Sequence, residues 1–232
     1  MNRLARVGVL LALTWLIAYL GAVAQGPEGA FQEAMRRGAA SMTAGDFGAA
    51  VAAYTTATQK MPAFAEGYLN LGLAQQQAGQ LDAARGSLNK ALQLKPGLRG
   101  ANLFLGIIAY RQNRFKDAEA HLLRETRLDP GSAKAFMWLG ICRLAQDDPQ
   151  GAIAPLDKAY ALDAKDVDIL YHRGHAYLLV ANASYAAMFK ADPDSMRVHQ
   201  VLGEADAASY RSSDAINEFE LAIKMAPRSA SE

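Results

Sequence analysis

Cysteine, charge of one sign and dense basic runs are all scarce in this chain of 232 residues. Cys142 is the only cysteine, so no internal disulfide can form, and we favour a small buried side chain over a reactive thiol. The 24 Lys and Arg residues against 23 Asp and Glu residues leave a formal net charge of +1. Nucleic-acid binding normally needs a basic face, so we expect no nucleic-acid partner.

Motifs of common catalytic sites are also missing. The sequence has no Gly-rich phosphate loop, no Gly-x-Ser-x-Gly elbow and no His-Glu-x-x-His helix. His172 and His175 lie three residues apart with Asp168 one turn earlier, a spacing that places them on one helix face. We interpret them as groove and surface histidines rather than metal ligands. We therefore expect a protein that is not an enzyme, with no catalytic residue, no metal and no cofactor.

The N-terminal segment, residues 1–24, has the order of a secretory signal peptide. Two arginines precede an apolar run over residues 7–20, and the Ala-Val-Ala of residues 22–24 matches the small-x-small cleavage pattern. A linker over residues 25–30 would follow. The alternative is an uncleaved membrane anchor, although the run is short for a span of about 20 residues. We predict a periplasmic or secreted protein without a membrane span after cleavage.

The rest of the chain is periodic, and its period of about 34 residues is typical of a two-helix repeat. One constant step separates the glycines Gly38, Gly72, Gly106, Gly140 and Gly174. The same step separates the prolines Pro62, Pro96 and Pro130, and the alanines Ala50, Ala84, Ala118 and Ala152. Glycine and alanine let two helices approach closely, and proline cannot continue a helix. The period therefore predicts helix–turn–helix units that end at the prolines.

These units resemble the tetratricopeptide repeat family. The second unit carries the resemblance in Tyr68, Leu71, Gly72, Ala84, Leu88, Ala91 and Pro96, and the last in His199, Leu202, Gly203, Ala215, Phe219, Ala222 and Pro227. The resemblance implies an all-α fold, a right-handed α-solenoid of about six repeats over residues 31–229, followed by a tail at 230–232. The repeats fit at about 31–64, 65–98, 99–132, 133–166, 167–195 and 196–229.

The fifth repeat is shortened. The step from Gly174 to Gly203 falls five positions short of the period, whereas Pro193 keeps the usual distance to Gly203. The missing residues therefore belong to the turn or to the start of the second helix. A tolerated deletion and a functional bend both remain open as interpretations. In the fourth repeat, Pro155 removes a backbone hydrogen bond and should kink the second helix.

In the family, the first helix of each repeat lines a concave face that binds partners. The matching positions predict a partner-binding groove made of Leu103, Ile107, Tyr110, Arg111, Lys134, Met137, Ile141, Leu144, Tyr171, His175 and Leu178. Its apolar and aromatic character suits a hydrophobic peptide or an amphipathic helix. The alternative is that these side chains pack against one another.

The resemblance thus implies an exported scaffold or adaptor that binds a peptide or helix of a protein partner, and assembly of an envelope, pilus or secretion complex is the role we expect. The alternatives are an accessory subunit of an envelope enzyme and a self-assembling structural module. No polar capping helix follows the sixth repeat in this sequence. A homodimer through that uncapped repeat is therefore a further expectation.

Overall fold

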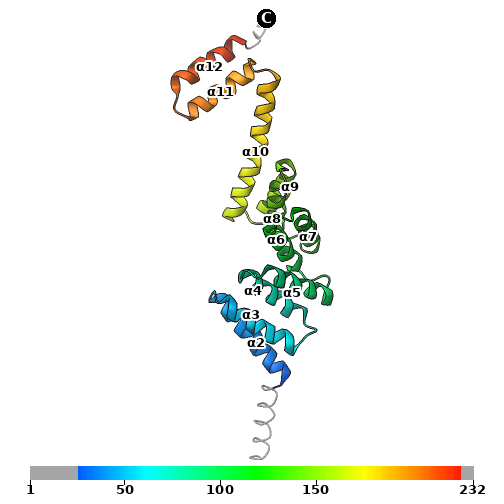
Figure 1. The fold of residues 1–232 in the computed structure, drawn as a ribbon. Coiled ribbons are helices and arrows are strands. Elements are labelled where there is room, and N and C mark those ends of the chain that lie inside the picture. The colour runs from blue at the N-terminus through cyan, green and yellow to red at the C-terminus, as the bar shows by residue number, and fades with distance from the viewer. Residues whose placement is uncertain (1–25, 226–232) are drawn as a thin grey trace, which may run out of the picture. The chain divides into compact units, whose positions relative to one another are not determined.

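A computed structural model describes residues 26–225, so the predicted signal peptide and tail lie outside the described residues. The described part is helical throughout and contains no strand, which confirms the all-α prediction (Figure 1). Its helices are α2 (Pro27–Thr43), α3 (Phe47–Lys60), α4 (Ala65–Gln77), α5 (Leu81–Leu94), α6 (Ala101–Arg111), α7 (Phe115–Leu128), α8 (Ala133–Leu144), α9 (Pro149–Leu162), α10 (Val167–Ala191), α11 (Met196–Ala208) and α12 (Ser212–Met225).

The chain divides into two compact units, Met1–His172 and Arg173–Glu232. In the first unit, helices pair as α2 with α3, α4 with α5, α6 with α7 and α8 with α9, and each second helix also packs on the first helix of the next pair. These pairs coincide with the first four predicted repeats. In the second unit, α11 and α12 form one more pair.

A residue with positive φ forms the turn inside each complete repeat. Gly45 and Gly79 have φ values of 75° and 77°, and Asn113 and Asp147 stand at the equivalent positions with φ of 57°. Asparagine and aspartate tolerate this left-handed conformation better than other residues with side chains. Tyr210 fills the same position between α11 and α12 with φ of 58°. One left-handed residue per repeat therefore reverses the chain.

The repeat glycines bring the two helices of a pair into close contact. A Cβ atom placed on Gly72 would lie 2.7 Å from Cγ of Leu88, and one on Gly106 would lie 2.7 Å from Cγ of Leu122. Leu88 and Leu122 are fully buried, as are the small alanines that face the same crossings. Only glycine leaves room for the large side chain that the second helix of the repeat places opposite it. The regular spacing of these glycines is thus a packing requirement.

Helix α9 continues through Pro155. Proline has no N–H, so the carbonyl of Gly151 loses its usual helical donor. The Nη1 of Arg143 donates to that carbonyl over 2.8 Å, while Nε of the same guanidinium donates to Glu119 over 2.9 Å. A side chain from α8 therefore replaces the hydrogen bond that Pro155 removes.

The shortened repeat has no turn. Its 25 residues from Val167 to Ala191 form the single helix α10, and neither glycine nor proline interrupts the sequence between Gly174 and Pro193. The deletion therefore removed the reversal and joined the two helices of the repeat end to end. Within residues 26–225, no helix is both long and apolar enough to cross a bilayer.

Candidate functional site

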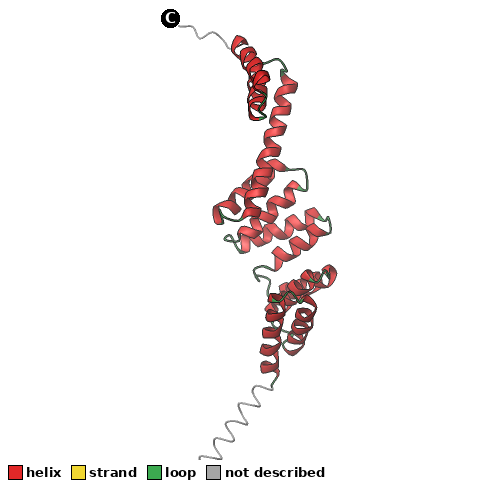
Figure 2. Cartoon of the chain, turned by 90° about the vertical axis from the view of Figure 1, so that its left-hand side faces the viewer, coloured by secondary structure: helices red, strands yellow, loops and turns green. Residues whose placement is uncertain are grey.

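The first helices of the second, third and fourth repeats form the candidate site. α4 contacts α6, and α6 contacts α8, so the outward side chains of these helices share one face of the first unit. This placement follows from the period, because each repeat presents the same helix side to its neighbour. Figure 2 shows the described chain as helices joined by loops.

The predicted groove residues divide by exposure. Leu103, Ile107, Met137 and Ile141 are buried, with exposed fractions of 7–8%. These four residues therefore have little surface to offer a partner. Their role in binding stays a prediction.

The remaining groove positions have surface to offer. Tyr110 and Leu144 are half-buried, and Arg111 and Lys134 are exposed. Tyr171, His175 and Leu178 are exposed on α10, Tyr171 in the first unit and the other two in the second. The accessible part of the candidate site in the first unit therefore consists of two half-buried side chains, two exposed cations and the exposed Tyr171.

An aromatic cluster joins α6 and α8, the first helices of the third and fourth repeats. The ring of Tyr110 lies 5.4 Å from that of Trp138 in an edge-to-face arrangement and 5.5 Å from that of Phe115, measured between ring centroids. Phe104 packs beside them and is also half-buried. Sequence reasoning missed Phe104 and Trp138, although each stands two residues before a repeat glycine. That shared offset was the signal that could have found them.

A pocket opens next to Phe115 at the end of the α6–α7 pair. Its volume is about 560 Å³, and it is lined by Asn113, Arg114, Phe115, Lys116, Asp117 and Gln146. Arg114 is paired with Asp117 over 2.8 Å, and Gln146 donates to Glu119 over 3.0 Å. The pocket is therefore lined by the ring of Phe115, and the charges of Arg114 and Asp117 beside it neutralise each other.

Two polar contacts fix α6 against α7. Nδ1 of His121 lies 3.0 Å from Oδ1 of Asn102, and burial, followed by the charge of Arg124, lowers the pKa of His121 below its usual value. Glu125 occupies a core position that is alanine in most repeats, and its carboxylate accepts the N–H of Gly100 over 2.5 Å. Glu125 is therefore buried and hydrogen-bonded.

The described residues include the one cysteine of the sequence. Cys142 is buried, as predicted; its thiol donates to the carbonyl of Phe115 over 3.1 Å, and burial raises its pKa to about 11. Such a thiol is almost fully protonated at neutral pH and is a poor nucleophile. Within residues 26–225, no group of three His, Cys, Asp or Glu side chains is arranged to hold a metal ion.

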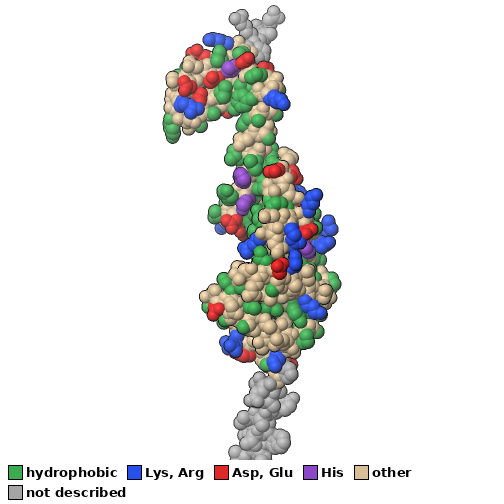
Figure 3. All heavy atoms as spheres, in the orientation of Figure 1, with side chains coloured by type: hydrophobic (Ala, Val, Ile, Leu, Met, Phe, Trp, Pro, Cys, Tyr) green, Lys and Arg blue, Asp and Glu red, His purple; other side chains and the backbone are tan. Residues whose placement is uncertain are grey.

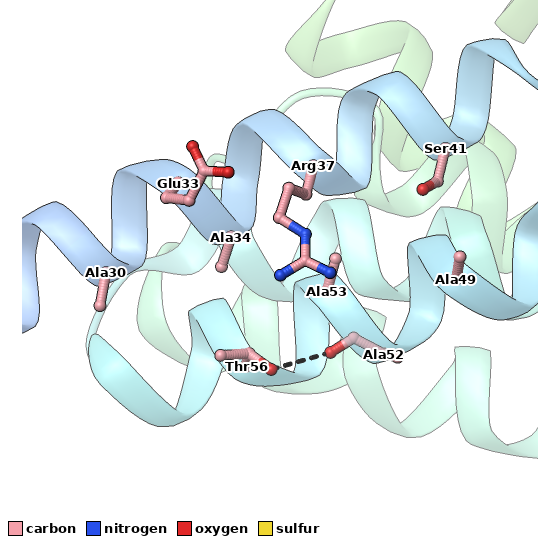
Figure 4. Close-up of a pocket in the computed structure, with 9 residues that line it drawn as sticks. All are labelled: Ala30, Glu33, Ala34, Arg37, Ser41, Ala49, Ala52, Ala53 and Thr56. Atoms are coloured by element: carbon pink, nitrogen blue, oxygen red, sulfur yellow. Dashed lines mark hydrogen bonds between the residues drawn. The ribbon is translucent and has the colours of Figure 1, made fainter.

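A second pocket, of about 420 Å³, lies between α2 and α3 on the first repeat (Figure 4). Alanines and the small polar residues Ser41 and Thr56 form most of its wall. The guanidinium of Arg37 reaches across the opening toward α3, whereas Glu33 points away and pairs with Arg36. Five of the nine residues that line this pocket are alanines.

Stacked antiparallel helix pairs with one glycine crossing each define the class of the protein, an α-solenoid. The sequence profile of the tetratricopeptide repeat matches residues 35–98 and 104–167. This match covers more than half of the chain, and the chain belongs to the tetratricopeptide repeat family. No curated protein matches the chain significantly.

Solved structures share the fold at low sequence identity. PilF of Pseudomonas aeruginosa is 18% identical over 85% of this chain and 92% of its own, with a TM-score of 0.61. MamA is 21% identical over 84% of this chain and 91% of its own, with a TM-score of 0.52. YrrB, described as having an unusual peptide-binding site, is 21% identical over 76% of this chain and 93% of its own, with a TM-score of 0.52.

Proposed function

We propose that this protein is an exported adaptor that binds a peptide or helix of a partner protein on the face formed by α4, α6 and α8. Membership of the tetratricopeptide repeat family supports a role in protein–protein interaction. The observation that carries the site is the set of half-buried side chains, Tyr110, Trp138 and Leu144, on α6 and α8, the helices that also carry the exposed cations Arg111 and Lys134.

This arrangement favours an amphipathic ligand. Half-buried aromatic and aliphatic side chains gain from further burial, and aromatic anchors commonly dominate binding energy at protein interfaces. Arg111 and Lys134 would steer a segment that carries acidic residues beside its apolar ones. The ligand that fits best is therefore an apolar segment with flanking carboxylates.

The cellular setting is a separate part of the proposal. The signal-peptide pattern of residues 1–24 supports export to the periplasm or beyond. Fold similarity to PilF, at 18% identity, is compatible with a role in assembling an envelope or pilus complex. An accessory subunit of an envelope enzyme is the alternative, and a cofactor that copurifies with the chain would favour it.

Crosslinked capture from the native envelope tests the binding face. We would compare the wild-type chain with the double variant Arg111→Glu and Lys134→Glu, which changes only exposed residues of the site. The matched control is Lys90→Glu with Lys158→Glu, because both lysines are exposed on second helices and the charge change is equal. We expect one captured protein to be lost from the site variant and kept by the control.

Affinity for that captured protein should fall about tenfold or more in the site variant, as expected for two lost charge contacts at an interface. Equal capture by all three versions would show that the partner binds elsewhere. Equal loss in both variants would show that net charge, and not this face, decides binding.

A further inference from the structure

The fifth repeat lacks the internal contact that the complete repeats have. In those repeats the glycine of the first helix faces a large side chain of the second helix, as in the pairs Gly38–Tyr54, Gly72–Leu88, Gly106–Leu122, Gly140–Leu156 and Gly203–Phe219. A Cβ atom placed on Gly174, the glycine of the fifth repeat, would meet no atom within 4 Å. In the complete repeats a large side chain occupies the space opposite the glycine; we call the corresponding space at Gly174 the Gly174 socket, and no atom of the described chain fills it.

The residue that would fill the socket is Tyr185. At the end of α10 the N–H of Asp192 donates to the carbonyl of Met188 over 3.1 Å, as the N–H of Asp163 donates to that of Ala159 at the end of α9. Met188 is therefore the equivalent of Ala159. Counting back three residues from each leads to Tyr185 and Leu156, so Tyr185 holds the place of the socket-filling side chain.

Tyr185 cannot reach Gly174 of its own chain. The two residues stand 11 positions apart on one continuous helix, which separates them by about 16 Å along its axis. Tyr185 is 44% exposed, whereas Leu88, Leu122 and Leu156 at the equivalent position are fully buried. Helix α10 thus exposes both Gly174 and Tyr185, which cannot contact each other within one chain.

These residues belong to a stripe along α10. Gly174, Leu178, Ala181, Tyr185 and Met188 follow one another at spacings of four, three, four and three, the pattern of a coiled-coil seam. Leu178 is 56% exposed. We call these five residues the α10 stripe.

The surroundings of the α10 stripe carry almost no charge. Residues 174–189 contain no Asp, Glu, Lys or Arg, and the middle of α10 shows only apolar and uncharged atoms in the view of Figure 3. An exposed helical surface of this length without charged residues indicates that another molecule binds there. It also offers no charge by which a partner of another kind would be recognised.

We propose that a second copy of this chain covers the α10 stripe, with the two α10 helices packed antiparallel so that each copy completes the fifth repeat of the other. Tyr185 of one copy enters the Gly174 socket of its partner, and Leu178 faces Ala181. Both contacts occur twice, as two-fold symmetry requires. Each of these two layers then pairs a large residue with a small one.

The contacts within the first repeat support this register. In the first repeat, Met35 and Met42 of α2 pack on the cluster that contains Ala50 and Tyr54 of α3. Met42 is the equivalent of Leu178, and Ala50 is the equivalent of Ala181. The two antiparallel α10 helices would therefore make, between two chains, the same contacts that the two helices of a complete repeat make within one chain.

Charge variants at the facing positions test the register by sedimentation of the complete chain over a range of concentrations. Leu178→Glu and Ala181→Lys should each weaken the dimer about a hundredfold, since each places two buried charges without partners in the seam. A mixture of the two variants should form a dimer again, because Glu then faces Lys in one layer and Leu faces Ala in the other. Ala183→Glu is the control, since Ala183 is exposed on the opposite side of α10.

The proposal would be overturned by a wild-type chain that stays monomeric, which would leave the stripe to some other partner. A dimer that survives Leu178→Glu would place self-association elsewhere, for instance at the sixth repeat. Failure of the mixture to recover, with helicity intact in both variants, would contradict the antiparallel register. This inference goes beyond the proposed adaptor function, and its variants leave Arg111 and Lys134 untouched.

Discussion

Replacement of a repeat glycine by alanine offers a direct test of the helix crossings. In Gly106→Ala the new methyl group would lie 2.7 Å from Cγ and 2.9 Å from Cδ2 of Leu122. Carbon atoms in contact prefer about 3.5–4.0 Å, so Leu122 must move by about 1 Å. Leu122 is fully buried in the core that α6, α7 and α8 share, which leaves it little room to move.

The expected result is a balance of two terms. Alanine favours a helix over glycine by about 1 kcal/mol, and overpacking costs about 1–3 kcal/mol. We expect Gly106→Ala to lower the free energy of unfolding by about 1 kcal/mol. The control Gly86→Ala lies inside α5 with no atom within 4 Å of its new Cβ, so it should raise that free energy by about 0.5–1 kcal/mol.

Urea unfolding measures both variants. Circular dichroism reports the whole chain, and the fluorescence of Trp138, on the neighbouring helix α8, reports the region of the change. A Gly106→Ala chain as stable as Gly86→Ala would refute the argument that the crossing needs glycine. A lower urea slope in either variant would instead show that the repeats had stopped unfolding together.

Two further predictions follow from buried polar contacts. The folded pKa of His121 lies below its usual value of 6.5, so the unfolded chain takes up the proton first as pH falls, and the stability that neutral His121 contributes is lost as pH falls from about 7 through the folded pKa. The free energy of unfolding should therefore change less between about pH 7.5 and 5.5 in His121→Gln than in the wild type. An equal change in both proteins would contradict this reading. Arg143→Met should cost about 1–3 kcal/mol by leaving the Gly151 carbonyl without its donor. In a Pro155→Ala background the helix regains its own N–H donor, so the cost of Arg143→Met should shrink by about 1 kcal/mol. If the double-mutant cycle shows no such coupling, Arg143 acts only through Glu119.

The repeats could be predicted from the sequence because the packing at each repeat position requires one particular type of residue. A glycine at one constant step along the chain means a close crossing, and a proline means a helix end. The turns at Asn113 and Asp147 were less visible, because a left-handed residue with a side chain leaves a weaker signal than glycine. The third and fourth turns therefore had to be inferred from the period.

Burial within the groove was beyond sequence reasoning for a different physical reason. The register identifies which side of a helix a residue occupies, but exposure depends on the size of the side chains on the next repeat. Ile141 and Met137 were predicted to line the groove and are nevertheless buried, whereas Trp138 and Tyr110 are half-buried. A substitution such as Ile141→Glu would therefore damage the fold as well as any interface.

The fifth repeat shows how one deletion can change the use of a surface. Leu178 was predicted as a groove residue because it matches Leu144, which is half-buried in a closed repeat. Once the turn is lost, Leu178 joins Tyr185 on the same side of one helix, and the stripe becomes complementary to itself. The exposed cations Arg111 and Lys134 remain on the other candidate surface. Partner binding and self-association would then rest on separate residues, so that Leu178→Glu should weaken the dimer about a hundredfold while the face of α4, α6 and α8 still binds its ligand.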